Sequence, residues 1–531
     1  MNAPGGVVVV GNGPVGQTTA LLLARWGVPV LLLDARPARD AVGSKAICQQ
    51  RDVLDVWACV GGSAIAAEGL TWTTARTFYR GAELHSWSFV DNGASPLPPF
   101  VNIGQDRTEA ILDDLIARQD LIDVRWSHEV TGLSQSADGV IVTCATASGP
   151  LEIAADHVVV AAGARAGALR DALGVRFDGE SFDDRFLICD IRADLPGWER
   201  ERRFYFDPPW NPDRQVLIHP CPGGTFRIDW QVPADFDLVA EEAYGGLDER
   251  IRDIIGAVPY EVVWKTVYRF HSRLADRMRV GRVLLAGDAA HLVAPFGARG
   301  LNSGVADAEN AAWKLAAVLH GWAPSSLLET YHRERHAAAV ENLEITTATM
   351  RFLVPPDAEG WSRRRALLEA ARTDPERRAE IDSGRFAEPF WYVDSPLTTP
   401  DPTRPFAGRP LRGHAPPAGP GVLVPDVPVT DPARPAVSRF RELVRDGVLV
   451  MVADAFEAAD LAGSLDAAIV APTRVLAAGA LGGGDRVLTA LGARPGEAWV
   501  IRPDGHVAAV VPALPTAVTS AVSRALGGVS A

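Results

Sequence analysis

The sequence predicts an α/β protein with two or three domains, and three observations support this fold class. The first residues alternate a buried strand, a glycine turn and a helix. The middle of the chain carries strands rich in aromatic and β-branched residues, and the last hundred residues again mix strands and helices. A chain of 531 residues is long enough to build several such bodies, each with its own core.

A βαβ unit opens the chain. Val7–Val10 and Val30–Leu33 are apolar runs typical of buried parallel strands. Between them, residues 11–16 read G-N-G-P-V-G, and helical spacing follows from Gln17 to Arg25. Asp34 ends the second strand. This G-x-G-x-x-G pattern, placed after a strand, before a helix and about 20 residues ahead of an acid, predicts a dinucleotide site.

The residues of this unit have separate expected roles. Gly11 makes the tight turn, Gly13 lets the backbone approach a pyrophosphate, and Gly16 lets the helix pack close to the sheet. The N-terminus of the helix offers free N–H groups and a positive dipole end to the phosphates. Asp34 is placed to accept a hydrogen bond from a ribose hydroxyl.

A second glycine-rich motif lies at Gly281–Lys314. Val283–Ala286 is a predicted strand that ends in Gly287 and Asp288, and a tight loop follows at 295–300. A long helix is expected from Leu301 to about Leu319. An acid at a strand end beside a glycine-rich helix start predicts a second polar-ligand site made of backbone donors.

Composition excludes several classes of partner. The formal net charge of −14 argues against nucleic acid and anionic membranes as partners, and no stretch is apolar enough to span a bilayer. The apolar content of 47% is that of an ordinary globular protein. We expect reduced thiols, no metal site and a cytoplasmic location, because no C-x-x-C or metal-type spacing connects Cys48, Cys59, Cys144, Cys189 and Cys221.

The rest of the chain is predicted from its patterns. Leu70–Phe89 and residues 185–230 read as strands of a separate, mostly antiparallel sheet, which could cover a flat apolar ligand. A helix is expected from Asp106, as N-cap, to Arg118. Further expected strands are Val124–Val130, Val140–Thr146, Asp156–Ala161, Val448–Ala453, Ala467–Ala471, Ala498–Arg502 and Val507–Val511.

These motifs together resemble the FAD-dependent aromatic hydroxylases, which are class A flavoprotein monooxygenases. Within them, the chain is most similar to the branch of 3-(3-hydroxyphenyl)propionate hydroxylase and the polyketide hydroxylases. The resemblance covers residues 5 to about 355. It rests on residues 11–16 with Asp34, on GSKAICQQR (43–51), on the helix start at Gln105, and on GRVLLAGDAAH…PFGARGLNSG (281–304).

The resemblance implies a GR2-type Rossmann FAD-binding domain at 1–180, with 70–105 joining the substrate-covering sheet at 181–275. Residues 276–388 would complete the FAD site with a helical region, and 389–428 would form a Pro-rich linker. Residues 429–531 resemble a thioredoxin-like domain, here without C-x-x-C, that helps dimerisation or stability.

The resemblance also implies which residues bind FAD. Asp34 and Arg36 would lie by the adenosine ribose, Lys45 and Gln105 by the ribityl or diphosphate region, and Asp288 by the ribityl chain. Backbone N–H groups near Gly300 would face the pyrimidine end of the flavin, where a helix N-terminus stabilises negative charge. The full expected set is Gly11, Gly13, Pro14, Val15, Gly16, Asp34, Ala35, Arg36, Lys45, Gln105, Val130, Gly163, Gly287, Asp288, Pro295, Gly300, Leu301 and Asn302.

The implied reaction consumes NADH or NADPH and molecular oxygen, and a flavin C4a-hydroperoxide transfers OH to an electron-rich aromatic ring. His219, on the covering sheet, is the candidate for accepting the phenolic proton or orienting the ring, and an ordinary strand histidine is the competing interpretation. Relatives have Asp-Gly where this chain has Ala162-Gly163, which puts the nicotinamide step in question. Candidates to pair with a substrate carboxylate are Arg76, Arg80, Arg203, Arg214 and Arg227.

Two alternatives stay open at this point. Baeyer–Villiger insertion or epoxidation of a polyketide would use the same flavin frame and differ only in the covering sheet. A flavin-binding scaffold without oxygenase activity would fit the Ala162 departure. The expected partner is a small aromatic molecule, and a homodimer is compatible with the sequence.

Overall fold

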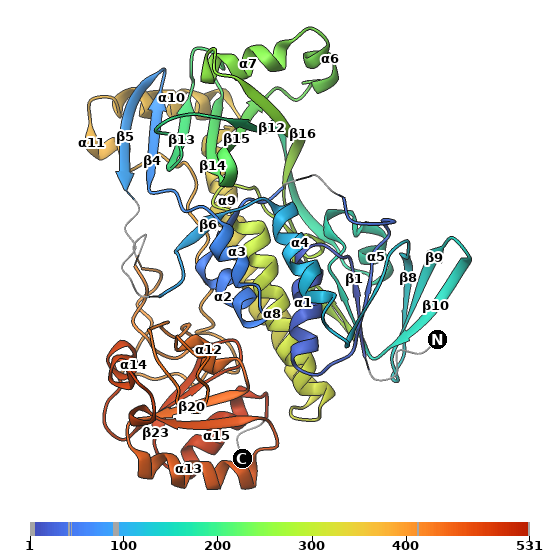
Figure 1. Cartoon of the computed structure of the whole chain (residues 1–531), viewed down its shortest axis with the longest axis vertical. Coiled ribbons are helices and arrows are strands. Elements are labelled where there is room, and N and C mark those ends of the chain that lie inside the picture. Colours follow the sequence, from blue (N-terminus) through green and yellow to red (C-terminus); the bar gives the residue numbers. More distant parts are fainter. Residues whose placement is uncertain (1–5, 41–42, 44, 89–94, 411–413, 529–531) are drawn as a thin grey trace.

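The computed structural model describes residues 6–40, 43, 45–88, 95–410 and 414–528. Figure 1 shows a central αβ body, a sheet above it, and a smaller αβ body at the C-terminal end. The apolar strands at the start of the chain lie where the sequence predicts them, at Val7–Val10 and Val30–Leu33. Every residue of both strands is buried, because each strand has a neighbour on both sides and helices or a second sheet across its faces.

The central sheet has five parallel strands and one antiparallel edge strand. α1 packs against α4 and α8, and apolar residues of these helices share one core with the sheet. In sheet order the strands are β17 (Arg279–Val280), β18 (Val283–Leu285), β11 (His157–Val160), β1 (Val7–Val10), β2 (Val30–Leu33) and β7 (Ile122–Arg125). Around them lie α1 (Pro14–Arg25), β3 (Cys48–Gln50), α2 (Arg51–Cys59), α3 (Ser63–Glu68), β6 (Phe100–Asn102), α4 (Gln105–Ile116), β8 (Glu129–Gln135), β9 (Val140–Thr146), β10 (Gly149–Ala155), α5 (Gly167–Ala172) and α8 (Arg299–Leu319).

The second sheet, called the covering sheet below, has eight strands and is antiparallel except between β13 and β4, which confirms the predicted separate, mostly antiparallel sheet. One face packs under α7, and the other packs against α9 and the segment around Phe296. In sheet order its strands are β19 (His291–Leu292), β16 (Tyr260–Ala275), β12 (Phe177–Ala193), β15 (Thr225–Val232), β14 (Gln215–Cys221), β13 (Glu201–Phe206), β4 (Thr74–Tyr79) and β5 (Ala82–Ser88). The helices beside it are α6 (Leu238–Ala243), α7 (Gly246–Ile255), α9 (Glu329–Leu353), α10 (Ala358–Ala370) and α11 (Pro375–Arg378).

The C-terminal body holds a four-stranded sheet in the order β21-β20-β22-β23. β20 runs parallel to β21 and antiparallel to β22. Its elements are α12 (Arg441–Val444), β20 (Val448–Val452), α13 (Ala455–Ala468), β21 (Thr473–Ala477), α14 (Gly484–Leu491), β22 (Glu497–Ile501), β23 (Val507–Pro512) and α15 (Pro515–Ala525). The proline-rich stretch before it contributes buried side chains such as Trp391, Tyr392 and Val424.

Two strand predictions are wrong in detail. Residues 124–130 form two strands, because Ser127 between them has a positive φ of 57° that no extended strand tolerates. Ala467–Ala471 is not a strand: α13 runs to Ala468, and the strand begins only at Thr473. The alanines there favour a helix, and a short apolar run does not separate helix from strand.

The predicted helix start at Asp106 is also wrong. α4 begins at Gln105 and is capped by the backbone of Gly104, so Asp106 lies in the first turn and caps nothing. The long helix of the second motif likewise starts two residues early, at Arg299. Phe89 and Ser44, which belong to stretches interpreted above, lie outside the described residues.

Candidate active site

The N-terminal glycine turn has the geometry that the dinucleotide pattern needs. Gly11 has a φ of +104°, and a Cβ atom there would lie 2.5 Å from the carbonyl oxygen of Ala161. A Cβ atom on Gly16 would lie only 1.8 Å from the carbonyl oxygen of Gly11 and would also touch Val9 of β1. A Cβ atom on Gly13 would meet nothing within 4 Å, so this stretch of backbone is open to an approaching group. α1 begins at Pro14 without a side-chain cap, which leaves its first N–H groups for a ligand.

The second motif packs directly on this turn. Val15 lies so close to Gly287 and Gly304 that a Cβ atom on either would come within 3.0 Å and 2.6 Å of it, respectively. Gly287 follows β18, which pairs with β11 in the sheet, and Gly304 belongs to α8. The two motifs, far apart in the sequence, therefore border one site at the carboxyl ends of the parallel strands, the usual place for a ligand in such sheets.

Asp288 and Lys45 lie at this site. Asp288 is exposed although its neighbours Gly287 and Ala289 are buried. Neighbouring protein atoms displace part of the water around its carboxyl and so raise its pKa, against the opposing charges of His291 and Lys45. The Lys45 ammonium also lies 5.9 Å from the ring centre of Tyr268 on the covering sheet.

Asp307, on α8, holds the end of β18 in place. Its Oδ2 accepts hydrogen bonds from the backbone N–H of Gly287 (2.9 Å) and pairs with Nε2 of His291 (2.7 Å). Its Oδ1 accepts from Nε of Arg335 on α9 at 2.6 Å. Burial alone would raise the pKa of Asp307, but His291 and Arg335 outweigh it and lower the pKa to about 2.

At the other side of the glycine turn, Asp34 is a buried acceptor. Its carboxylate accepts from the backbone N–H of Asn12 at 2.8 Å and from the Arg36 guanidinium at 2.9 and 3.0 Å. Burial opposes ionisation, but the bonds from Arg36 and Asn12 prevail and lower the pKa of Asp34. Ala35 between them is exposed. The backbone of residues 127–128, just before Val130, donates to the carbonyls of Arg36 and Asp34.

Sequence reasoning missed two side chains here. Arg39 donates to Oδ1 of Asn12 at 3.0 Å, to Glu109 at 2.6 Å and to Asp113 at 2.7 Å, so it ties the glycine turn to α4. Trp126 lies under the guanidinium groups of both Arg39 and Arg36, 5.4 and 5.6 Å from their central carbons. No local sequence pattern predicts these contacts, because the partner residues belong to separate elements.

The side chains of Gln105 and Asn302 hold neighbouring loops in place through hydrogen bonds. Oε1 of Gln105 accepts from the backbone N–H of Ala46 (3.1 Å), next to Lys45. Asn302 accepts from the N–H of Gln50 and donates to the carbonyl of Cys48, both at 3.0 Å. The start of α8 is thereby fixed against β3. Gly300, Leu301 and Pro295 border the same helix start, whereas Gly163 lies after β11 with a φ of +69°.

The covering sheet turns a charged face toward this region. His219 lies opposite Arg227, and Arg227 forms a buried bidentate pair with Asp190 at 2.7 and 2.8 Å. Burial, and then the charge of Arg202, hold the pKa of His219 well below its usual value, so the imidazole is neutral at pH 7. A neutral histidine beside two arginines is a weak base, which favours an orienting role.

All five arginines that the sequence suggests for a substrate carboxylate already have carboxylate partners. The pairs are Arg76 with Glu201, Arg80 with Asp207, Arg203 with Glu201, Arg214 with Asp184 and Arg227 with Asp190. Among the described residues, no group of three or more His, Cys, Asp or Glu side chains could hold a metal ion. No helix in the described ranges is long and apolar enough to cross a membrane.

Comparison with known proteins decides the family. The FAD binding domain family matches residues 6–346, which span both glycine motifs and the covering sheet. The chain belongs to the FAD-dependent aromatic hydroxylases. It is therefore a flavoprotein monooxygenase, and the open backbone at Gly13 with the uncapped start of α1 fits the FAD pyrophosphate.

Named relatives agree with this assignment. The chain is 30% identical over 393 residues, 73% of its length and 68% of the other's, to 3-(3-hydroxy-phenyl)propionate/3-hydroxycinnamic acid hydroxylase of Mycolicibacterium smegmatis. It is 29% identical over 384 residues, 70% of its length and 92% of the other's, to para-nitrophenol 4-monooxygenase of a Pseudomonas strain. The fold also matches the flavin-dependent monooxygenase PieE, solved with FAD and substrate, at a TM-score of 0.85, 22% identity and 99% coverage of both chains.

Proposed function

We propose that this flavoprotein uses NADH or NADPH and molecular oxygen to hydroxylate a phenolic or polyketide-type aromatic substrate. Bound FAD supplies the redox chemistry, by the route that the family resemblance implies. The observation that carries the proposal is the contact of Val15 with Gly287 and Gly304, which brings two backbone-donor motifs to one site beneath an aromatic sheet.

The protein's own residues have assigned parts in this proposal. The first turn of α1 binds the pyrophosphate, and Asp34 with Arg36 binds the adenosine ribose. Asp288 and Lys45 bind the ribityl and phosphate region. The start of α8 at Gly300–Asn302 directs N–H groups toward the pyrimidine edge, where negative charge develops on reduction. The covering sheet excludes water.

We assign the C-terminal body to a thioredoxin-like domain that lacks redox chemistry. The strand order β21-β20-β22-β23, with one parallel and two antiparallel pairings, supports this assignment. All five cysteines of the chain precede residue 222, so the body has no thiol. Its role is structural.

The test is NAD(P)H oxidation in air by the purified FAD-loaded protein, with and without a panel of phenols and hydroxyquinones, followed by mass spectrometry. We expect the aromatic compound to stimulate oxidation and the product to gain one oxygen atom. Ring-opened or lactone products would indicate oxygen insertion instead. A protein that holds FAD but converts no member of the panel, even with chemically reduced flavin, would contradict the proposal.

A further inference from the structure

The face of the covering sheet that carries His219 also carries Asp229. In the antiparallel pairing of β14 with β15, His219 lies opposite Arg227, and Leu217 lies opposite Asp229. His219 and Asp229 are therefore diagonal neighbours on one face, a spacing that long side chains and a small ligand can bridge. Arg227 pairs with Asp190 in the next strand, β12. Asp229 adds a second acid to this face.

Asp229 differs from the other ions of this face because it has an unsatisfied oxygen. The Asp190 carboxylate takes two bonds from Arg227, whose third N–H group donates to the carbonyl of Lys45 at 3.0 Å. Oδ1 of Asp229 is buried and has no hydrogen-bond partner among the described residues, and neither has Nδ1 of His219. A buried polar atom without a partner costs stability, so a native protein keeps one for a reason such as a ligand.

The position of Asp229 points to the aromatic substrate. Leu217, opposite Asp229, packs in one cluster with Ala294 and Phe296, which lead into the loop at the start of α8. The bond from Arg227 to the Lys45 carbonyl fixes the other side of the same region, next to Asp288. Asp229 therefore lies on the sheet face that covers the reacting end of the proposed flavin site.

We propose that Asp229 is the base that accepts the hydroxyl proton of a phenolic substrate. The proposal rests on the proposed function. In this step the O–H bond of the substrate breaks, a new O–H bond forms on the Asp229 carboxylate, and the electron pair stays on the substrate oxygen. The resulting phenolate has more electron density ortho and para to its oxygen, where hydroxylation takes place.

The electrostatics suit this role. The charged and titratable groups around Asp229 are Asp190 on β12, Arg202 on β13, His219 and Cys221 on β14, Arg227 on β15, and Lys45 on the loop packed against them. Burial raises the pKa of Asp229 to about 7, against the opposing charges of Arg227 and Arg202. A base with this pKa is available near neutral pH, and the two arginines stabilise the phenolate. His219 stays neutral and orients the hydroxyl.

The direct test measures ionisation of a bound phenol without turnover. The FAD-loaded protein is titrated with a panel of nitro-substituted phenols in the absence of NAD(P)H, because their phenolates absorb visible light and the neutral phenols do not. We expect the wild type to bind the probe as phenolate at pH values where the free probe is neutral. Asp229→Asn keeps the shape of the side chain and should bind the probe as neutral phenol.

Two further variants control for structure. Asp184→Asn changes another half-buried acid of the same sheet, whose carboxylate already accepts from Gln231 and Arg214, and should behave as the wild type. Asp229→Glu should restore part of the phenolate signal. Equal FAD content of all variants establishes that the fold is intact.

Turnover gives a second readout. With a phenol that the wild type oxygenates, Asp229→Asn should lower kcat/KM about 100-fold or more and remove the acidic limb near pH 7. A wild type that binds the probes as neutral phenols, or an Asp229→Asn variant that keeps the phenolate signal and the acidic limb, would overturn the assignment while the monooxygenase stands. A wild type that binds and oxygenates no phenol would overturn both.

Discussion

At the level of single residues, the proposed site depends on carboxylates that accept several hydrogen bonds from the protein itself. Asp34 and Asp307 each accept from a backbone N–H of one glycine motif and from an arginine, which is Arg36 in the same loop for Asp34 and Arg335 of α9 for Asp307. Each acid therefore fixes the backbone of one glycine motif as well as a neighbouring side chain. Asp229 is the contrasting case, with an oxygen left for a ligand.

Replacing Asp34 with Asn should weaken FAD binding. The change removes a charged acceptor for both the Asn12 N–H and the Arg36 guanidinium, and a hydrogen bond to a charged group contributes about 1.5–3 kcal/mol, so we expect the Kd for FAD to rise roughly 10- to 100-fold. Fluorescence titration of the apoprotein with FAD measures the effect. Asp40→Asn, which removes the exposed second partner of Arg36, is the matched control and should leave the Kd within a factor of two or three.

The low pKa of Asp307 predicts how the stability of the folded protein changes in acid. Because its pKa is about 2 in the folded protein and near 3.8 when unfolded, the stability it contributes is complete above pH 4 and is lost as the pH falls toward 2. We expect Asp307→Asn to lower the free energy of unfolding by about 3–5 kcal/mol at pH 7, since Arg335 and its neighbours keep buried charge without a partner. Urea unfolding measures this, and the exposed Asp123→Asn should cost under about 1 kcal/mol.

At the level of elements, the start of α8 contains a strained residue. Ala298, which precedes the helix, has a φ of +56° and a ψ of +42°, the left-handed region that L-residues enter at a cost. Ala298→Gly should therefore raise the melting temperature of the apoprotein and its free energy of unfolding by about 0.5–1 kcal/mol, once the greater freedom of glycine in the unfolded chain is subtracted. Ala306→Gly, inside the same helix, should instead destabilise by about 1 kcal/mol. A loss of stability on Ala298→Gly would contradict this account.

Elements also show what the sequence can and cannot predict. The bounds of the strands Val7–Val10 and Val30–Leu33 were predictable to the residue, because a strand that is buried on both faces has an unbroken run of apolar residues. The strand beginning at Thr473 was not, since its neighbours are alanines that suit either structure. The glycine motifs predict a cofactor site from sequence alone, whereas the contacts of Arg39 and the unpaired Oδ1 of Asp229 depend on which distant strands and helices meet.

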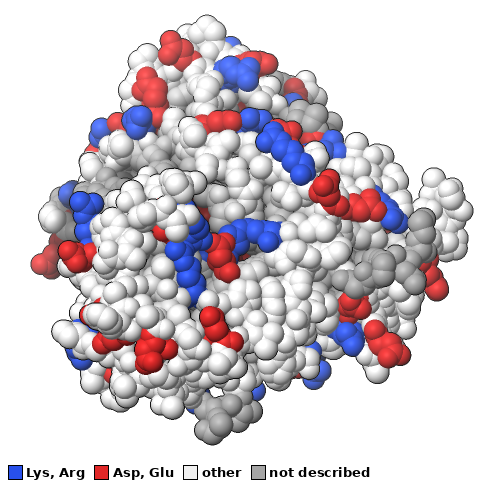
Figure 2. Space-filling model, turned by 60° about the horizontal axis from the view of Figure 1, so that its bottom comes forward, with Lys and Arg blue, Asp and Glu red and all other residues white. Residues whose placement is uncertain are grey.

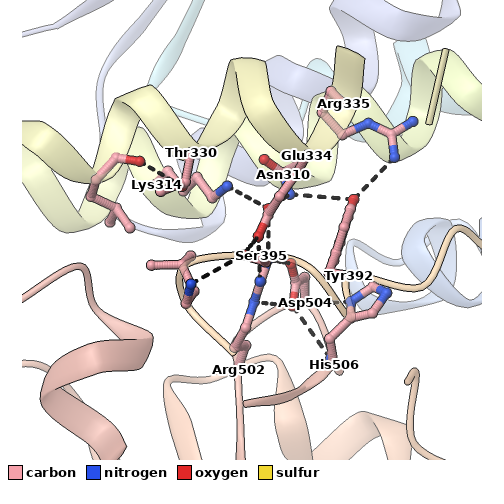
Figure 3. A network of polar contacts seen from close by, with 12 residues as sticks. Asn310, Lys314, Thr330, Glu334, Arg335, Tyr392, Ser395, Arg502, Asp504 and His506 are labelled. Atoms are coloured by element: carbon pink, nitrogen blue, oxygen red, sulfur yellow. Dashed lines mark hydrogen bonds and ion pairs between the residues drawn. The ribbon is translucent and has the colours of Figure 1, made fainter. Parts of the chain in front are cut away.

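At the level of the whole molecule, a buried ion network ties the C-terminal body to the two long helices (Figure 3). The guanidinium of Arg502, the residue after β22, binds Glu334 of α9 at 2.6 and 3.0 Å and Asp504 at 2.5 Å. Glu334 also takes a bond of 2.6 Å from Lys314 of α8. Next to Glu334, Arg335 joins Tyr392 at 3.0 Å on one side and Asp307 on the other. The network therefore extends from the C-terminal body to the end of β18.

A second contact joins α2 to the C-terminal body. Asp55 of α2 is fully buried and binds Arg445 at 2.6 Å, and Arg445 binds Glu309 of α8 at 2.8 Å.

Beside α8 lies a cavity of about 80 Å³, lined by residues such as Asn310, Arg335 and His506. On the face in Figure 2, acidic and basic side chains also lie interspersed on the outer surface.

Removing the Arg502 side chain should weaken the attachment of the C-terminal body to α8 and α9. Arg502→Met leaves Asp504 and part of Glu334 buried without their main cation, and we expect a loss of about 3–5 kcal/mol in the free energy of unfolding. The Kd for FAD should rise as well, because Glu334 and Arg335 are neighbours on α9 and Arg335 positions Asp307. Arg494→Met, an exposed arginine of the same body, is the control and should change stability by under about 1 kcal/mol. An unchanged FAD affinity in a destabilised Arg502→Met would show that the network is only structural.

The meeting of Val15 with Gly287 and Gly304 also has a consequence for synthesis of the chain on the ribosome. The first half of the protein can form β1, α1 and β2 as it emerges, but the opposite border of the proposed cofactor site is made by β18 and α8, which are translated much later. Until then, the edge of β11 that β18 will cover has no partner strand. FAD can therefore act as a ligand that stabilises the nearly finished chain, and cellular FAD supply should determine how much newly made protein escapes aggregation.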